Sequence, residues 1–155
     1  MENKEFKEDL IFEFNNLQRL VDEMKELLSK ISECPSFIEI RSAASILHDF
    51  YSGVEKIFKR IALSVDNNLP KGEDWHRELL LQMAKPFGKR KKAIISGKLL
   101  EKLKEYLRFR HLFRHIYGFE LKWESFKELC NKLGEIFKEF QSEIDGFLKE
   151  LEKND

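Results

Sequence analysis

The sequence predicts an all-α fold, an antiparallel bundle of four to five helices, on three observations. Proline and glycine are scarce, with 3 and 7 among 155 residues, while charged residues make up 36% of the chain. Lys, Glu and Leu are abundant and lose little side-chain freedom in a helix. Apolar residues recur every three or four positions, and no run alternates as a β-strand would. The length suits one core, so residues 1–155 are expected to form a single domain.

The first half of the chain is expected to form two long helices. Residues 3–33 carry one apolar stripe, which a Cys-Pro step interrupts. Ser36 and Glu39 have the spacing of a capping box, in which the two side chains satisfy free amides at a helix start. They predict the beginning of a second helix. Its apolar stripe continues to Val65, and the turn-forming residues 67–72 end it.

The second half is expected to contain three more helices. Asp74 is expected to cap a short helix, and Ser96 precedes a fourth helix that leads into the polar stretch described below. Gly118 is expected to end that fourth helix, because glycine tolerates the left-handed conformation that closes many helices. The last helix is expected at about 123–152, with an apolar stripe suited to a core, a dimer seam or both.

The net charge of zero conceals an uneven distribution. Residues 85–115 hold eleven Lys/Arg and two acidic residues, a net charge of +9, and the rest of the chain carries −9. A basic stretch on an otherwise acidic chain favours an anionic partner at one face. For residues 89–92 taken alone, a solvated lysine-rich loop is the alternative.

The composition is typical of a soluble, cytoplasmic protein. Cys34 and Cys130 are too few for a disulfide framework or a zinc knuckle and are interpreted as free, partly buried thiols. The charged first residues are unlike a signal peptide. No apolar run approaches the roughly 20 residues that span a bilayer. No cofactor, metal or membrane partner is expected.

The stretch from Arg108 to Gly118 is the densest group of functional side chains, with three arginines, two histidines and a tyrosine. Its aromatic and aliphatic residues supply an inward face, which leaves the polar groups clustered elsewhere on the helix. Arginine offers bidentate contacts to phosphate, and histidine exchanges protons near neutral pH. The stretch therefore indicates an anion-binding site.

Arg110, His111 and His115 fit the site of the HEPN superfamily, an arginine, a polar residue, three further residues and a histidine. Tyr117 stands two positions after the histidine, where the HepT-like branch has a tyrosine. Arg108 matches a looser six-residue spacing to His115, but only Arg110 gives the shorter spacing that ends in His-x-Tyr.

The likeness extends beyond this motif. Residues 47–51 and 74–76 also resemble HepT-like proteins, so that the resemblance covers about residues 43–123. The sequence is thus similar to the HepT-like ribonuclease toxins of HEPN/minimal nucleotidyltransferase toxin–antitoxin systems.

The resemblance implies a metal-independent endoribonuclease that acts on RNA as a homodimer, with paired motifs facing each other across a cleft. His115 is expected to transfer protons, and Arg110 to hold the phosphate and stabilise the charge of the transition state. Other RNA or phosphate contacts are expected from Arg108, His111, Arg114, Lys89, Arg90, Lys91 and Lys92. The loop lysines would add sequence-independent attraction to the RNA backbone.

The resemblance also implies a partner, a nucleotidyltransferase antitoxin that silences the toxin by adding AMP to Tyr117. Bulk and negative charge beside the cleft would block RNA and pair with the arginines. The alternative is a tyrosine at a helix end that packs against Trp123.

Helix geometry constrains the site. A regular helix separates Arg110 and His115 by about 140° around its axis. The two side chains are therefore expected to converge on one phosphate only if the helix is distorted near its end or a partner chain completes the site.

Several alternatives remain open from the sequence. His111 and His115 have the spacing of two zinc ligands, although no matching carboxylate or cysteine cluster accompanies them. His48 and Asp49 resemble a base and its orienting acid, but neighbouring helical residues point about 100° apart, which favours a structural role. The Trp-His pair at 75–76 is interpreted as packing and capping. The rival function is a non-catalytic HEPN module that binds a nucleotidyltransferase or another protein.

Overall fold

The computed structural model describes residues 2–153, with side chains from Lys4 onward. The α-helices are α1 (Glu2–Lys30), α2 (Phe37–Ile61), α3 (Trp75–Met83), α4 (Gly97–His115), α5 (Trp123–Asn131) and α6 (Leu133–Lys153). A π-helical turn, η1 (Ala62–Asp66), extends α2, and a 3-10 turn, η2 (Gly118–Glu120), follows α4. Within this range the chain forms no strand, and the prediction of an all-α fold is confirmed.

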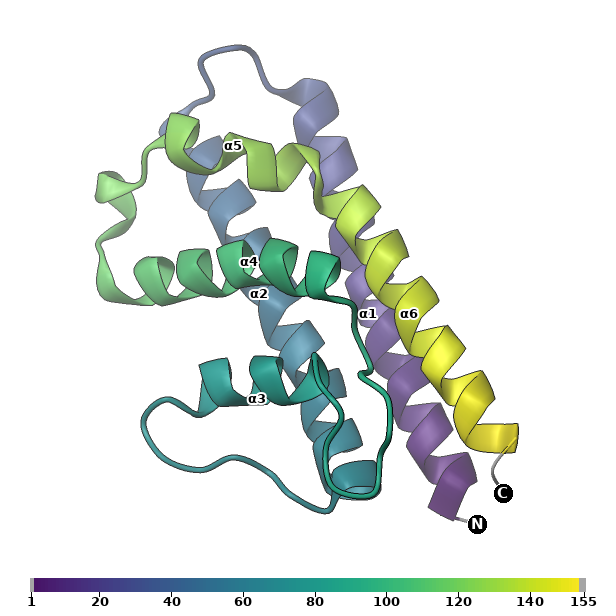
Figure 1. Cartoon of the computed structure of the whole chain (residues 1–155). Coiled ribbons are helices and arrows are strands. Elements are labelled where there is room, and N and C mark those ends of the chain that lie inside the picture. Colours follow the sequence, from purple (N-terminus) through teal and green to yellow (C-terminus); the bar gives the residue numbers. More distant parts are fainter. Residues whose placement is uncertain (1, 154–155) are drawn as a thin grey trace.

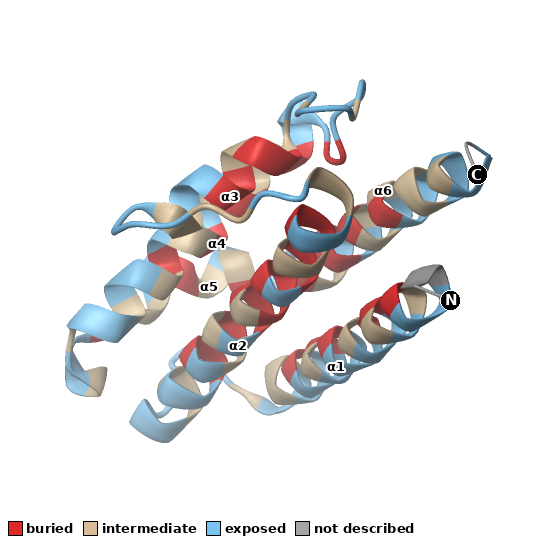
Figure 2. Ribbon diagram, turned by 90° about the horizontal axis from the view of Figure 1, so that it is seen from below, coloured by how far each residue is buried: buried red, intermediate tan, exposed pale blue. Residues whose placement is uncertain are grey.

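Helix α2 lies at the centre of the fold. Helices α1, α3, α4 and α5 pack against it, and α6 packs against α1. Helix α1 runs antiparallel to α2 and α6, while the shorter α3, α4 and α5 lie across the long helices (Figure 1). Buried residues line the inward faces of the helices (Figure 2). All six helices contribute side chains to one hydrophobic core.

A glycine sets the distance between the two helices that open the chain. A Cβ atom on Gly53 of α2 would lie 2.5 Å from Leu17 Cδ2 on α1, closer than real Cβ contacts. The missing side chain therefore allows α1 and α2 to pack closely along their buried faces. An ion pair between Arg60 and Asp9 joins the same two helices at their edge.

The predicted helix starts are confirmed. The Glu39 N–H donates to Ser36 Oγ at 3.2 Å, and the Ser36 N–H donates to Glu39 Oε1 at 2.8 Å, which completes the capping box of α2. Ser96 caps α4 by accepting from the Leu99 N–H at 3.1 Å. Asp74 occupies the cap position of α3, but its side chain accepts no capping hydrogen bond.

Two of the predicted helices differ from the structure. The helix expected at 123–152 is divided at Lys132 into α5 and α6. Its apolar stripe continues in phase through the break, so that the pattern gives no sign of the change in direction. Helix α4 ends at His115, three residues before Gly118, and Ile116 is extended. Gly118 instead lies against Arg41, whose guanidinium would overlap a Cβ atom at that position.

The two thiols differ in environment. Cys34 is exposed, contrary to the expectation of partial burial, and Cys130 is buried. Burial raises the pKa of the Cys130 thiol to about 12. Among residues 2–153, no helix combines the length and the apolar character that crossing a membrane requires.

Candidate functional site

Helix α4 has a buried side and a polar side. Leu99, Leu103, Tyr106 and Phe109 are buried, and the Tyr106 hydroxyl donates to the Leu129 carbonyl of α5 at 2.7 Å. These contacts fix the rotation of α4 about its own axis. The polar residues of the motif are consequently left along the side that faces α3.

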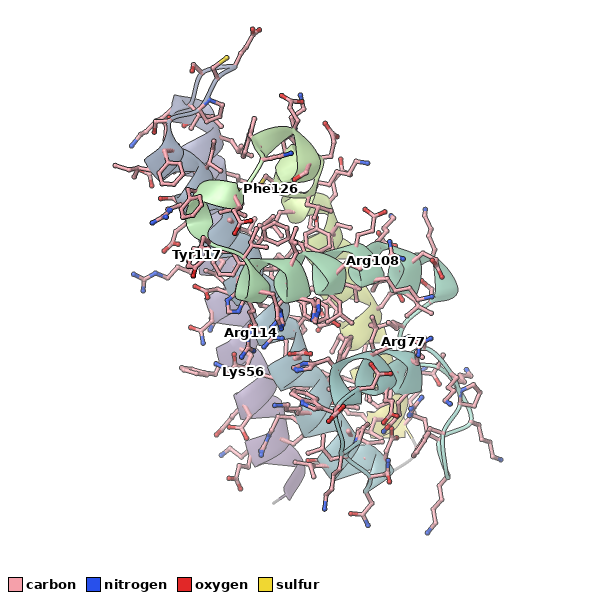
Figure 3. The ribbon with its side chains drawn as sticks, turned by 90° about the vertical axis from the view of Figure 1, so that its left-hand side faces the viewer. Lys56, Arg77, Arg108, Arg114, Tyr117 and Phe126 are labelled. Carbon is pink, nitrogen blue, oxygen red and sulfur yellow. The ribbon has the colours of Figure 1, made fainter. Side chains whose placement is uncertain are left out.

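A groove of about 860 Å³ runs between α3 and α4. Figure 3 shows Arg77 on α3 and Arg108 on α4 on neighbouring sides of it, with Arg114 nearer the end of α4. The lining residues are Glu73, Asp74, His76, Arg77, Leu80, Leu81, Lys104, Leu107, Arg108, Arg110, His111, Arg114 and His115. Five Lys/Arg and three histidines therefore face two carboxylates, an excess of positive charge that attracts anions.

Arg110 is anchored at the inner side of this groove, and its side chain is only 11% exposed. Its Nε donates to Ser52 Oγ of α2 at 3.2 Å and lies 3.8 Å from Glu55 Oε1. Within residues 2–153, Nη1 and Nη2 take part in no hydrogen bond. The guanidinium is thus held by one nitrogen and retains its two terminal nitrogens for a bidentate contact with an anion.

Glu55 connects Arg110 to a histidine on α3. The residue is 3% exposed, and its Oε2 lies 2.6 Å from His76 Nδ1. A buried carboxylate is costly unless it is paired, and Glu55 has one partner on each oxygen. The hydroxyl of Tyr51 is buried beside this pair without a partner among the described residues. Burial, and then the charge of Glu55, raise the pKa of Tyr51, and Arg110 partly offsets the rise.

His115 lies at the outer end of the groove, as the last residue of α4. Its Nδ1 is 2.7 Å from the His111 carbonyl oxygen, which can only accept a hydrogen bond, so Nδ1 carries the proton. The neutral ring then has its lone pair on Nε2. The His111 and His115 rings are adjacent, with centroids 4.3 Å apart.

Arg110 and His115 line the same groove without any distortion of the helix. Helix α4 is regular through His115, so convergence of the two side chains on one phosphate stays a prediction that depends on a partner chain. The groove covers about 160° of the circumference of α4, from Arg110 at one edge to Arg108 at the other. That width accommodates both residues in one chain.

Tyr117 lies outside the groove and is 70% exposed. Its ring stacks on Phe119 with centroids 5.3 Å apart, and the ring of Trp123 packs instead against Phe126. The alternative of packing against Trp123 is therefore wrong. The Tyr117 N–H donates to the Glu120 carboxylate at 2.9 Å, which holds the turn that presents the ring.

The basic loop lies at the other end of α3 and α4 from His115 (Figure 1). Lys89, Lys91 and Lys92 are exposed but do not line the groove. Arg90 differs from them, because its side chain is 6% exposed and forms a bidentate pair with the covered carboxylate of Asp66. The donors of Arg90 are therefore used within the fold, and Arg90 is not one of the proposed RNA contacts.

Sequence reasoning missed Glu55, Ser52 and His76 as parts of the site. Glu55 stands at a position where the helical stripe of α2 is otherwise apolar, and a charged residue on that stripe is the signal that could have identified it. His76 was interpreted as a packing residue. No sequence signal pairs it with Glu55, 21 residues away.

The other histidine pairs have no site of their own. His48 Nδ1 approaches Asp49 Oδ1 to 3.4 Å, closer than the helical angle suggested, but the His48 ring packs on Phe113 and lies outside the groove. In the part of the chain that the structure describes, no three His, Cys, Asp or Glu side chains are gathered as a metal site. His111 and His115 accordingly have no third ligand there.

The helical fold and the Arg110–Tyr117 motif are those expected of a HEPN-type protein, and comparison with known families identifies the branch. A sequence model of the family described as HepT-like protein matches residues 42–151, or 110 of 155 residues. The chain belongs to the HepT-like family, as the Arg110–Tyr117 motif predicted. Searches of curated proteins and of solved structures each found no match.

Proposed function

We propose that this protein is an endoribonuclease that cleaves RNA in the groove between α3 and α4, as a HepT-like toxin. The observation that carries the proposal is the presence of Arg110, His111 and His115 along one basic groove. Arg110 would bind the scissile phosphate through Nη1 and Nη2 and stabilise the charge that accumulates on its oxygens. These side chains supply proton transfer and charge stabilisation themselves, so the proposed reaction needs no metal ion.

The proposed reaction is an intramolecular transesterification at the scissile phosphate. His115 Nε2 would remove the proton of the ribose 2′-OH, and the 2′-oxygen would attack the neighbouring phosphorus while the bond to the departing 5′-oxygen breaks. His111 and Arg114 lie beside His115 and would orient the RNA strand. Arg108 and the exposed loop lysines would attract the backbone of longer RNA regardless of its sequence.

Cleavage of end-labelled RNA in the presence of EDTA tests the proposal. His115→Ala is expected to lose about 10²- to 10⁴-fold in rate, the usual contribution of a proton-transfer group. Arg110→Ala is expected to lose about 10²- to 10³-fold. His48→Ala serves as the matched control, because this histidine lies outside the groove. Equal cleavage by wild type and both groove variants would contradict the proposal.

We also propose a homodimer, with the motifs of two chains near one another. Large apolar side chains are exposed around the end of α4 and the start of α2, among them Leu112, Phe119, Phe37 and Ile38. Large apolar side chains that are left exposed favour an interaction site when they gather on one face. Light scattering coupled to size exclusion would test it, and a monomer at micromolar concentration would contradict it.

Control by a nucleotidyltransferase is the remaining part of the proposal. The exposed ring of Tyr117 follows Arg114 by three residues, so AMP attached there would bring a phosphate close to the basic end of the groove. Intact mass after co-expression with a nucleotidyltransferase encoded beside this chain should show an AMP adduct that Tyr117→Phe abolishes. An adduct that persists in the variant would place the modification elsewhere.

A non-catalytic interaction module is the second candidate. The exposed aromatic residues around Tyr117 favour it, because such residues are enriched at protein interfaces. The RNA assay separates the two: a module would bind its partner with the same affinity in wild type and His115→Ala and would cleave no RNA.

A further inference from the structure

One histidine of the groove lies on the wall opposite α4. His76 is in the first turn of α3, its side chain is 26% exposed, and it lines the groove together with Arg110 and His115. The Trp75 ring lies against the His76 imidazole, tilted by 30° with centroids 3.6 Å apart, and Lys59 Nζ lies over the Trp75 ring. The imidazole therefore has a defined plane, which a freely rotating surface histidine lacks.

Glu55 determines which ring nitrogen of His76 remains free to contact a ligand in the groove. The carboxylate can only accept, so His76 Nδ1 donates to it over 2.6 Å. Within residues 2–153, Nε2 takes part in no hydrogen bond. A buried carboxylate that accepts from Nδ1 of a histidine fixes the orientation of the ring.

The Glu55 carboxylate also fixes the position of the His76 imidazole relative to the Arg110 guanidinium. Glu55 Oε1 is 3.8 Å from Arg110 Nε, while Oε2 binds His76. Because Glu55 is buried on the central helix, the anion-binding guanidinium and the imidazole have a fixed relative position. An anion bound by Arg110 would therefore have His76 on its α3 side.

We propose that His76 is the general acid of this site and that Glu55 is its positioning residue. The inference rests on the proposed ribonuclease function. His115 Nε2 takes the proton of the 2′-OH, the bond from the 2′-oxygen to phosphorus forms, and the bond from phosphorus to the 5′-oxygen breaks. His76 Nε2–H gives its proton to the departing 5′-oxygen. The products are a 2′,3′-cyclic phosphate and a 5′-hydroxyl, and the two histidines then exchange one proton each with water.

A substrate with a modified leaving group tests the acid directly. A short DNA strand with a single ribonucleotide would carry either the normal 5′-oxygen or a bridging 5′-sulfur at the cleavage site. A thiolate leaves without protonation, because the pKa of a thiol is near 8.5. His76→Gln, whose amide can still donate to Glu55, is expected to lose about 10²- to 10⁴-fold on the oxygen substrate and to recover to within about 10-fold of wild type on the sulfur substrate.

His115→Ala is the contrasting variant and is expected to be impaired on both substrates, because the 2′-OH must still lose its proton. Glu55→Gln is expected to show a smaller loss that the sulfur substrate also relieves. Circular dichroism melting checks that each variant is folded. Wild-type rates for His76→Gln on the oxygen substrate, or an equal loss on both substrates, would overturn the proposal while leaving the ribonuclease function intact. Failure of the wild type on both substrates would instead refute the ribonuclease function itself.

Discussion

Replacing Arg90 with alanine is expected to destabilise the fold. The guanidinium donates from Nε to Asp66 Oδ1 at 2.8 Å and from Nη2 to Asp66 Oδ2 at 2.9 Å. It also donates to the backbone carbonyls of Gln82, Lys85 and Lys92, at 3.1, 2.8 and 2.7 Å. Arg90 thus joins the end of α3 and the basic loop to the π-helical turn after α2.

The burial of this pair sets the size of the effect. The Arg90 side chain is 6% exposed and the Asp66 side chain is fully covered. Without Arg90, the Asp66 carboxylate would keep only the Gln82 amide, at 2.9 Å, as a side-chain partner among the described residues. Removing one member of a buried ion pair costs about 3–5 kcal/mol. In a domain of this size each kcal/mol lowers Tm by about 2–4 °C, so the expected fall is about 6–20 °C.

Thermal melting followed by far-UV circular dichroism measures this fall. Lys91→Ala is the matched control, because its exposed side chain, one residue away, makes no contact that the structure records, and its stability should stay within about 0.5 kcal/mol of wild type. If Arg90→Ala melts with the wild type and loses affinity for RNA, the guanidinium is a ligand contact and the structural role argued for it is refuted.

Four further outcomes are expected. Gly53→Ala should lower the free energy of unfolding, measured by urea denaturation, by about 1–3 kcal/mol, because its Cβ would lie 2.5 Å from a leucine on α1. Gly146→Ala lies on an open helical surface and should raise the free energy of unfolding by about 0.5–1 kcal/mol. Equal effects of the two substitutions would contradict the packing argument. A thiol reagent at pH 8 should modify Cys34 alone in the native protein and Cys130 only after unfolding. Because the pKa of Cys130 is raised to about 12, the unfolded chain loses the thiol proton above about pH 9 while the folded chain keeps it. The free energy of unfolding should therefore fall between about pH 9 and pH 12 by up to about 1.4 kcal/mol per pH unit. Cys130→Ala should remove this part of the pH dependence. Lys91→Ala should lower the salt dependence of single-stranded RNA binding by about 0.7 in log–log slope, and an unchanged slope would exclude this lysine from RNA contact.

Local signals in the sequence were sufficient for the helix starts. The capping residues Ser36, Glu39 and Ser96 act on amides three residues away, so their effect can be read from adjacent positions. The break at Lys132 could not be read in this way. The apolar stripe of α5 and α6 keeps its phase, and the direction changes because α5 packs on α2 while α6 packs on α1.

Some residues of the candidate site could likewise be predicted from local sequence, and others could not. Arg110 and His115 are five positions apart on one helix, and their residue types and spacing identified them directly. Glu55 and His76 belong to two other helices, and only the packing of α3 and α4 on α2 brings them to the groove. The 21 residues that separate Glu55 from His76 carry no local signal, because a side chain's identity does not specify a partner across a helix interface.

By itself, the sequence determined the helical class, the family and the arginine and histidine of its motif, since each depends on residues that lie close together along the chain. The tertiary structure decided which side chains surround them. It removed Arg90 from the anion-binding set, because burial against Asp66 uses its donors within the fold. It added the Glu55–His76 pair, because a carboxylate on the central helix can be buried only where the folded chain supplies a partner.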